Sequence, residues 1–537
     1  MSGDRSKLSF DASVMTRRQL LQRFGLFGGS SLVLGTMNAL DLMATTSRPR
    51  PVLEGNANAR VIILGAGISG LVAGYELGKL GYDYQILEAR DRVGGLAWTV
   101  KQGSEHTELG PDGERQVCQF DEGNYINAGP WRIPHSHTSV TGYCKELGVR
   151  LEQFVDDNTV MFSENPELGP LANQKVRLRE VTSDMWGHTT ELLAKAVNQG
   201  ALDQQLTTED KERLLEFLVR AGYLDGPDQL YSANEEARGS ADVYDLNTLL
   251  STPFVSQVRS VNAGTGGPAP VFQPTGGMMQ IPLAFERAIG DRITRGAAVE
   301  TVRQSDNGVS VVYRNTRTGE RQEVTGDYVI CCLPMSILKL LDVNFSPEMA
   351  AAVEETGHAS QAKMGVQAKR RFWEEDDGIY GGHLFYMPYQ EGGPGGGRGR
   401  NPIPSFSYPS NDFHSASGVL LGFYGNSQTP SILDGRPLVE VPIAHRIEHV
   451  VTATSKIHPQ MREEFDNAYA VWWDRVEYSR GAWASSGATR DRLAVPDGRI
   501  FIGSAALSDH PAWIDGAIHA AWQSIEALHE RAVQTTA

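Results

Sequence analysis

The chain has 537 residues, a length that corresponds to three or four domains of about 150 residues each. Hydrophobic residues make up 40% and charged residues 21% of it, which is a globular composition and excludes disorder, collagen or a coiled coil as a description of the whole chain. Lysine and arginine total 49 against 65 aspartates and glutamates, and the net charge is -16. Because so acidic a chain repels phosphate backbones, we expect no nucleic-acid partner.

The N-terminus carries a candidate targeting signal. Arg17 and Arg18 precede a short, glycine-diluted apolar stretch over 24–35, which resembles a twin-arginine export signal. We therefore assign residues 1–56 to a signal-like or disordered N-terminus and expect export to the periplasm or secretion, with a basic tail on a cytoplasmic protein as the alternative. No apolar run reaches the roughly 18 residues of a membrane span, so we expect no transmembrane segment. The four cysteines are too few for a disulfide framework and are expected to be buried thiols.

The first chemical motif begins at residue 60. The run 60–64 is apolar and of strand length, and a glycine turn over 65–70 follows it and opens an amphipathic helix that runs to Leu80. Glycines permit a tight turn and a close approach of the backbone to a pyrophosphate, whose charge the helix N-terminus stabilises. A second strand over 84–87 ends at Glu88, which is placed to accept a ribose hydroxyl. The unit predicts a dinucleotide site, and the carboxylate disfavours NADP.

The residues after Glu88 carry a family resemblance. The segment Glu88–Gly95 resembles the extended signature of flavin amine oxidases, in which a second glycine pair approaches the flavin phosphates, and this makes FAD the expected cofactor. From residue 60 to about 530 the chain resembles the flavin-dependent L-amino acid oxidases. The block 273–282 is similar to the one that returns the chain to the FAD domain in that family, and 328–334 reads as a buried parallel strand.

The resemblance implies a discontinuous chain organisation. The expected fold class is α/β, with a Rossmann-like FAD-binding domain, an α+β substrate-binding domain and a helical lobe. The expected FAD-binding domain comprises 57–102, 269–342 and 490–532, the substrate-binding domain 103–180 and 343–489, and the helical domain 181–268. A hairpin around Asn307 and Gly308 is expected to pair 299–302 with 309–312, and the glycine-rich insertion 392–400 is expected to form an exposed loop.

The segment 127–134 is similar to the one in which amino acid oxidases place an arginine over the flavin. Arg132 is the expected ligand of the substrate carboxylate, because a guanidinium forms two parallel charge-assisted hydrogen bonds to a carboxylate. The block 404–409 resembles the one whose tyrosine shares that carboxylate, which makes Tyr408 the second expected ligand. A structural ion pair for Arg132 and a core position for Tyr408 are the alternatives.

Further blocks suggest the remaining parts of the active site. By resemblance, Lys363 holds a water against the reactive flavin nitrogen and supports reoxidation by oxygen, where a nearby cation stabilises developing negative charge. Trp513, at the start of a helix whose positive end faces the flavin, is the expected aromatic wall of the site. Trp131, Trp473 and Trp483 are expected to line the substrate pocket.

The expected cofactor contacts follow from the same blocks. They are Gly65, Gly67, Ile68, Ser69, Gly70, Glu88, Ala89, Arg90, Gly94, Gly95, Gly129, Pro130, Trp131, Arg132, Val299, Gly503, Ser504, Trp513 and Ile514. Two positions depart from the family pattern: Leu96 stands where arginine is usual, and Ser504-Ala505 stands where many members have Gly-Glu. Because no cysteine occurs over 499–516, we expect FAD to be bound noncovalently, and the scattered histidines predict no metal site.

The resemblance implies oxidative deamination of L-amino acids to 2-oxo acids, ammonia and hydrogen peroxide, with molecular oxygen as co-substrate. The tryptophans favour large apolar or aromatic substrates. The alternatives are a decarboxylating amino acid 2-monooxygenase, an amine or polyamine oxidase, and, from another class, a non-catalytic flavin-binding redox protein. A homodimer is expected because dimers are common among relatives.

Overall fold

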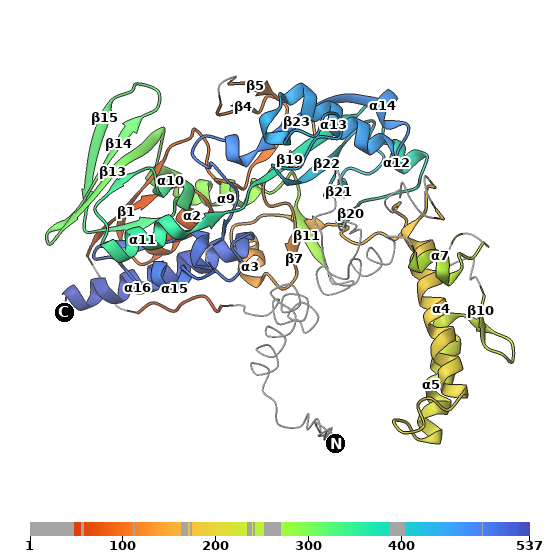
Figure 1. Ribbon diagram of the computed structural model, residues 1–537. Coiled ribbons are helices and arrows are strands. Elements are labelled where there is room, and N and C mark those ends of the chain that lie inside the picture. Colours follow the sequence, from red (N-terminus) through yellow and green to blue (C-terminus); the bar gives the residue numbers. More distant parts are fainter. Residues whose placement is uncertain are drawn as a thin grey trace, which may run out of the picture.

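The computed structural model describes residues 48–54, 58–110, 113–162, 170–171, 174–232, 239, 242–251, 270–385, 403–485 and 487–536. The signal-like residues 1–47 and the glycine-rich insertion 392–400 lie outside the described residues. Within the described part, the chain forms two large sheets with helices around them and a helical arm that projects away from both (Figure 1).

A five-stranded parallel sheet forms the first half of the molecule, and its strands come from three separate stretches of the chain. In spatial order they are β12 (Ile293–Arg295), β2 (Asp83–Glu88), β1 (Arg60–Leu64), β16 (Tyr328–Cys331) and β25 (Ile500–Ile502). The strands expected over 60–64 and 84–87 are therefore confirmed, and the strand expected over 328–334 is confirmed for 328–331. Burial on both faces explains why β1 is apolar without alternation: Val61 and Ile63 join one core cluster, and Ile62 and Leu64 join another.

Helices cover one face of this sheet and a second sheet covers the other. The helices are α2 (Ile68–Lys79), α3 (Thr138–Glu146), α9 (Gln280–Ile289) and α16 (Ile514–Thr536). The opposite face packs against β13 (Ala297–Ser305), β14 (Gly308–Asn315), β15 (Arg321–Gly326) and β17 (Asp342–Val343), with α10 (Met335–Leu338) and α11 (Pro347–Glu355) beside them. The expected hairpin around Asn307 is confirmed, and a β-bulge interrupts β13 between Val299 and Thr301.

The second large sheet is antiparallel. Its order is β20 (Gly382–Phe385), β21 (Ser405–Tyr408), β22 (Gly418–Asn426), β19 (Gln361–Ala368) and β23 (Phe465–Trp472). One face packs against α13 (Ile443–Ser455), with α12 (Phe372–Glu375) and α14 (Met461–Glu464) nearby. The other face packs with residues of the shorter strands β3 (Thr99–Lys101) and β6 (Tyr125–Asn127).

Smaller elements connect these layers. A three-stranded sheet joins β7 (Ile133–Pro134), β11 (Val271–Pro274) and β8 (Leu151–Gln153), and pairs are formed by β4 (Glu105–Thr107) with β5 (Arg115–Val117) and by β18 (Gly357–His358) with β24 (Ala484–Ser485). Short helical turns occur at α15 (Arg490–Leu493), η1 (Gly290–Arg292), η2 (Leu438–Glu440), η3 (Trp473–Arg475) and η4 (Ala505–Leu507). The sheets and helices confirm the expected α/β class; the domain boundaries remain a prediction.

The helical arm contains α4 (Leu178–Asn198), α5 (Thr208–Gly222) and α7 (Leu246–Leu250), with the strand pair β9 (Leu224–Asp225) and β10 (Leu230–Tyr231). Thr207 caps α5 by accepting a hydrogen bond from the Asp210 backbone, while the Asp210 side chain accepts one in return. Helix formation expected within 181–268 is thus confirmed for the described residues.

Two further expectations, on the cysteines and on membrane-spanning helices, can be checked. Cys118, Cys144 and Cys331 are buried thiols as expected, whereas Cys332 is partly exposed because it lies on the wall of a cavity. Among the described helices, none is both long enough and apolar enough to cross a bilayer.

Candidate functional site

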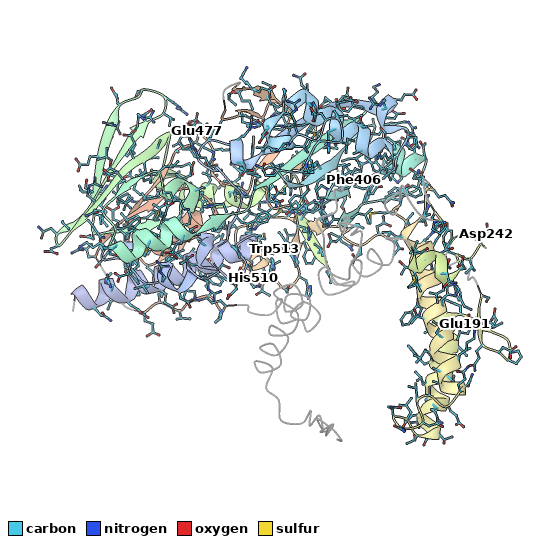
Figure 2. All side chains as sticks on the ribbon, in the orientation of Figure 1. Glu191, Asp242, Phe406, Glu477, His510 and Trp513 are labelled. Atoms are coloured by element: carbon cyan, nitrogen blue, oxygen red, sulfur yellow. The ribbon has the colours of Figure 1, made fainter. Side chains whose placement is uncertain are left out.

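A cavity is lined by residues from both large sheets and from the segments that connect them. Most of the predicted site residues line it, namely Gly65, Gly67, Ile68, Ser69, Glu88, Ala89, Arg90, Gly94, Gly95, Gly129, Pro130, Trp131, Arg132, Val299, Lys363, Trp473, Trp483, Ser504, Trp513 and Ile514. Trp513 immediately precedes α16, so the positive end of that helix faces the cavity. Figure 2 labels Trp513 and the neighbouring His510 at this end of the helix.

The glycine turn has the geometry that a dinucleotide requires. Gly65 has φ +93°, and a Cβ at Gly70 would lie 2.0 Å from the Gly65 carbonyl oxygen, so neither position accepts a side chain. Gly67 is the N-cap of α2 and supplies no capping side chain, and a Cβ there would meet no protein atom within 4 Å. The first N–H groups of α2 therefore face open space in which a phosphate group fits.

Glu88 is held rigidly at the end of β2. Its side chain accepts hydrogen bonds from the Ala66 N–H and the Arg90 N–H, both at 2.9 Å, and the residue is 4% exposed. Arg90 donates to the Ser479 hydroxyl at 2.7 Å and to the Glu477 carbonyl. These contacts fix one wall of the cavity, where Glu88 is available to a ribose hydroxyl.

Arg132 lies between aromatic rings and an acid. Its guanidinium carbon is 5.1 Å from the ring centre of Trp131 and 5.3 Å from that of Trp513. Its Nε is 3.5 Å from an oxygen of Asp156, and the residue is 7% exposed. A buried cation with aromatic faces around it is suited to hold an anionic group that enters the cavity.

Lys363 and Tyr424 line the same cavity from neighbouring strands of the second sheet. They are directly paired across β19 and β22, and the Lys363 Nζ lies 4.6 Å from the Tyr424 ring centre. Lys363 donates to the carbonyls of Gly129, at 2.5 Å, and Asn127, at 3.3 Å. Burial lowers the pKa of Lys363 well below its usual value, and the Arg132 charge lowers it further. Burial also raises the pKa of Tyr424, which keeps its hydroxyl protonated.

Three predicted site residues do not line the cavity. Tyr408 is fully buried on the other face of the second sheet, where its hydroxyl lies 2.6 Å from Nε2 of His458. The prediction that Tyr408 contacts the substrate is therefore wrong. Gly70 supports the turn from behind, and the carbonyl of Gly503 accepts a hydrogen bond from the Ser69 hydroxyl. Both act on the cavity only through their neighbours.

The cavity also contains residues that the sequence did not single out. Tyr424, His358, Gln361, Tyr478 and Ser479 all line it. The sequence of β22 carries no signal for Tyr424, because the strand is buried along most of its length and only its pairing with β19 places Tyr424 opposite Lys363. Within the described residues, no group of three or more His, Cys, Asp or Glu side chains could hold a metal ion.

Comparison with known proteins identifies the family. The profile of the flavin-containing amine oxidoreductases matches residues 68–528, which is most of the chain. The chain belongs to the flavin-containing amine oxidoreductase family. L-amino acid oxidase Bs29 of Bothriechis schlegelii is 26% identical over 87% of this chain and 89% of that protein, and the flavin-dependent L-tryptophan oxidase RebO of Lentzea aerocolonigenes is 26% identical over 87% and 98%.

A solved structure supports the fold of this flavin-containing amine oxidoreductase. A putrescine oxidase variant superimposes with a TM-score of 0.55 at 18% identity, over 89% of this chain and 100% of that one. Family membership implies a flavin cofactor, and the open helix N-terminus, the glycine turn and the acid at the end of β2 fit one.

Proposed function

We propose that this flavin-containing amine oxidoreductase catalyses the FAD-dependent oxidative deamination of L-amino acids to 2-oxo acids, ammonia and hydrogen peroxide. The observation that carries the proposal is Arg132, a buried guanidinium on the wall of the cavity. An amine without a carboxylate would leave this charge without a substrate partner. An amino acid gives it one, which favours amino acids over simple amines.

Three residues account for substrate orientation. Arg132 binds the carboxylate through two N–H groups, and the Tyr424 hydroxyl donates a third hydrogen bond in the role first expected for Tyr408. Trp513 limits the position of the amine and the Cα. A bound flavin would accept a hydride from the Cα and pass two electrons to oxygen. The protein contributes mainly by holding the Cα–H in reach of the acceptor.

Lys363 acts in the second half of the reaction, in which oxygen reoxidises the flavin. Because burial and the Arg132 charge lower the pKa of Lys363 well below its usual value, its amine can hold a water molecule by hydrogen bonds and exchange a proton with it as negative charge develops on oxygen. The aromatic walls formed by Trp131, Trp473 and Trp483 favour large apolar or aromatic side chains. Noncovalent binding of FAD agrees with Cys332, whose thiol pKa burial raises to about 12, which makes it a poor nucleophile.

The proposed function is tested with the purified yellow protein. We expect L-phenylalanine or another of the twenty standard L-amino acids to bleach the flavin without oxygen and to form peroxide in air. Mass spectrometry of the product separates the outcomes, because a 2-oxo acid supports an oxidase and an amide one carbon shorter indicates a monooxygenase. Turnover of putrescine or phenethylamine with none of any amino acid would replace the proposal by an amine oxidase.

Removal of the hydroxyl group is expected to have different effects at Tyr424 and at Tyr408. Tyr424→Phe removes a hydrogen bond to a charged carboxylate, so we expect KM for L-amino acids to rise about 10-fold or more. Tyr408→Phe leaves the buried His458 without its hydroxyl partner, so we expect kinetics within about twofold of wild type and a free energy of unfolding lower by about 1–3 kcal/mol. Steady-state kinetics and denaturant unfolding measure the two effects. The opposite pattern would return the substrate role to Tyr408.

Lys363→Met should slow flavin reoxidation by oxygen roughly 100-fold, because one preorganised donor beside a developing charge is lost while its volume is kept. Rapid mixing of the substrate-reduced protein with oxygen measures this rate. Lys369→Met is the matched control, since Lys369 is exposed, donates to the Glu463 carbonyl and does not line the cavity. Equal reoxidation rates in wild type and Lys363→Met would contradict the role.

We also propose that the protein is exported, on the basis of Arg17 and Arg18. A separate proposal is that it forms a homodimer through the helical arm. Several large apolar side chains of the arm are exposed, namely Trp186, Leu192, Phe217, Leu230 and Leu250. The arm projects from the body, and Glu191 marks α4 in Figure 2. Large apolar side chains exposed on one arm favour burial against a partner, and we infer a second copy of the chain as that partner. Light scattering should give twice the chain mass and a lower mass for Phe217→Arg with Leu250→Arg; a monomeric wild type would contradict the proposal.

A further inference from the structure

Arg132 contacts a carboxylate that is not part of the cavity wall. Asp156 follows β8, and its side chain is 11% exposed. Its Oδ1 lies 3.5 Å from Arg132 Nε, yet Asp156 is absent from the residues that line the cavity. The ion pair therefore lies behind the surface that a substrate would meet.

A neutral histidine holds this acid in place. His383 Nδ1 is 3.4 Å from the same oxygen of Asp156, and His383 Nε2 is 2.6 Å from the Ser405 hydroxyl. Burial lowers the pKa of His383 to about 4 even though Asp156 raises it, and the Arg132 charge lowers it further, so the ring is neutral at pH 7. The negative charge of Asp156 beside Nδ1 favours the tautomer with the proton on Nδ1, and in that tautomer Nε2 accepts from the Ser405 hydroxyl.

The backbone fixes the same pair. The His383 N–H donates to the Asp156 carbonyl at 2.9 Å, and the Gly382 N–H donates to the Val155 carbonyl at 3.0 Å. The His383 ring also meets the Trp131 ring edge-on, with 4.5 Å between ring centres. Trp131 and Arg132 are consecutive wall residues, and both rest on the Asp156–His383 pair.

The contacts of Arg132 differ in what they restrain. The faces of Trp131 and Trp513 limit tilting of the guanidinium, but a ring face offers no preferred direction within its plane. The Asp156 carboxylate does distinguish one edge of the guanidinium, because it lies 3.5 Å from Nε and its attraction is strongest when the Nε edge is turned toward it. Asp156 thus restrains the rotation that the rings leave open.

We propose that Asp156 is a positioning residue that fixes the rotation of the Arg132 guanidinium, so that its N–H fork meets the substrate carboxylate in one orientation. This inference rests on the proposed amino acid oxidase function. It differs from a pure charge effect in sign: removing a nearby negative charge would by itself strengthen binding of another carboxylate, whereas losing orientation weakens it.

Two substitutions separate orientation from charge. Asp156→Asn removes the charge but keeps an oxygen acceptor at the same place, and Asp156→Ala removes both. The probe is benzoate, a carboxylate without an amine, which is titrated into the flavin-loaded protein while the flavin absorbance is followed. We expect Asp156→Ala to bind benzoate about 10-fold more weakly, equivalent to about 1.4 kcal/mol. Asp156→Asn should stay within about threefold of wild type.

Kinetics provide the second readout. With L-phenylalanine, Asp156→Ala should raise KM about 10-fold with a smaller change in kcat, and Asp156→Asn should restore KM to within about threefold of wild type. Unchanged benzoate affinity in Asp156→Ala, or tighter binding in both variants, would overturn the inference while leaving the proposed function intact. A wild-type protein that neither binds benzoate nor oxidises any amino acid would remove the proposed function and this inference with it.

A third variant, Asp156→Glu, tests the inference even if Asp156→Ala does not retain its flavin. Asp156→Glu keeps the charge and moves the carboxylate by one methylene group, so the positioning role predicts benzoate binding about 10-fold weaker than wild type. Wild-type affinity in Asp156→Glu would overturn the inference.

Discussion

Arg132→Ala is expected to lower kcat/KM for L-amino acids about 1000-fold, or roughly 4 kcal/mol, because truncating one partner of a buried, hydrogen-bonded charge pair leaves the other without its counter-charge. Arg132 is 7% exposed and lines the cavity. Most of the loss should appear in KM, since the carboxylate is bound in the ground state as well as in the transition state. Steady-state oxygen consumption measures both constants.

Two comparisons make this result specific. Arg132→Lys keeps the charge but presents no planar fork, so it should recover only part of the loss. Phenethylamine, which has no carboxylate, should be turned over by Arg132→Ala no more slowly than by wild type. Flavin absorbance must match wild type in each variant, because Arg132 and Trp131 also border the cofactor space. An equal loss of kcat/KM with both substrates would show that Arg132 maintains the fold of the site and does not bind the substrate carboxylate.

The cofactor half of the site could be predicted from the sequence because its geometry is local. The strand, glycine turn, helix and acid occur within 60–88, and the hydrogen bond from the Ala66 N–H to Glu88 closes the unit. Gly65 and Gly70 have backbone reasons within the turn itself, and Gly67 leaves open space at the start of α2. The parallel strands were recognisable for the same reason, since burial on both faces produces a continuous apolar run.

The substrate-binding residues were harder to predict, because their roles depend on which face of a strand each side chain occupies. A short sequence block does not determine this. Tyr408 on β21 lies in the core with Phe406 and Phe423, while Tyr424 on β22 lies on the cavity face beside Lys363. The two strands are neighbours in one sheet. Because successive side chains point to opposite faces, only the register of β22 against β19 places Tyr424 in the site.

Asp156 could not be predicted because its role arises from contacts between distant segments. It reaches Arg132 because β8 and β7 both pair with β11, which lies more than 100 residues later in the chain. Its second partner, His383, comes from yet another sheet. Nothing in the local sequence around Asp156 distinguishes it from an exposed acid after a strand.

Gly70→Ala is expected to abolish flavin retention, because the new Cβ would lie 2.0 Å from the Gly65 carbonyl oxygen and the backbone must move to relieve the overlap. The turn and the start of α2 would shift together, which removes the N–H groups that face the phosphate. The ratio of flavin to protein absorbance after purification measures the effect, and thermal unfolding should show a less stable protein.

Gly67→Ala separates cofactor binding from folding. Its backbone has φ -68°, and a Cβ would meet no protein atom within 4 Å, so the apoprotein should keep its stability. The same methyl group would project into the space for the pyrophosphate, so flavin affinity should fall about 10- to 100-fold through lost hydrogen bonds to a charged group. Gly142→Ala, in α3 with the same open surroundings but outside the cavity, is the matched control. If Gly67→Ala and Gly142→Ala retained flavin equally well, the open end of α2 would not be the phosphate site.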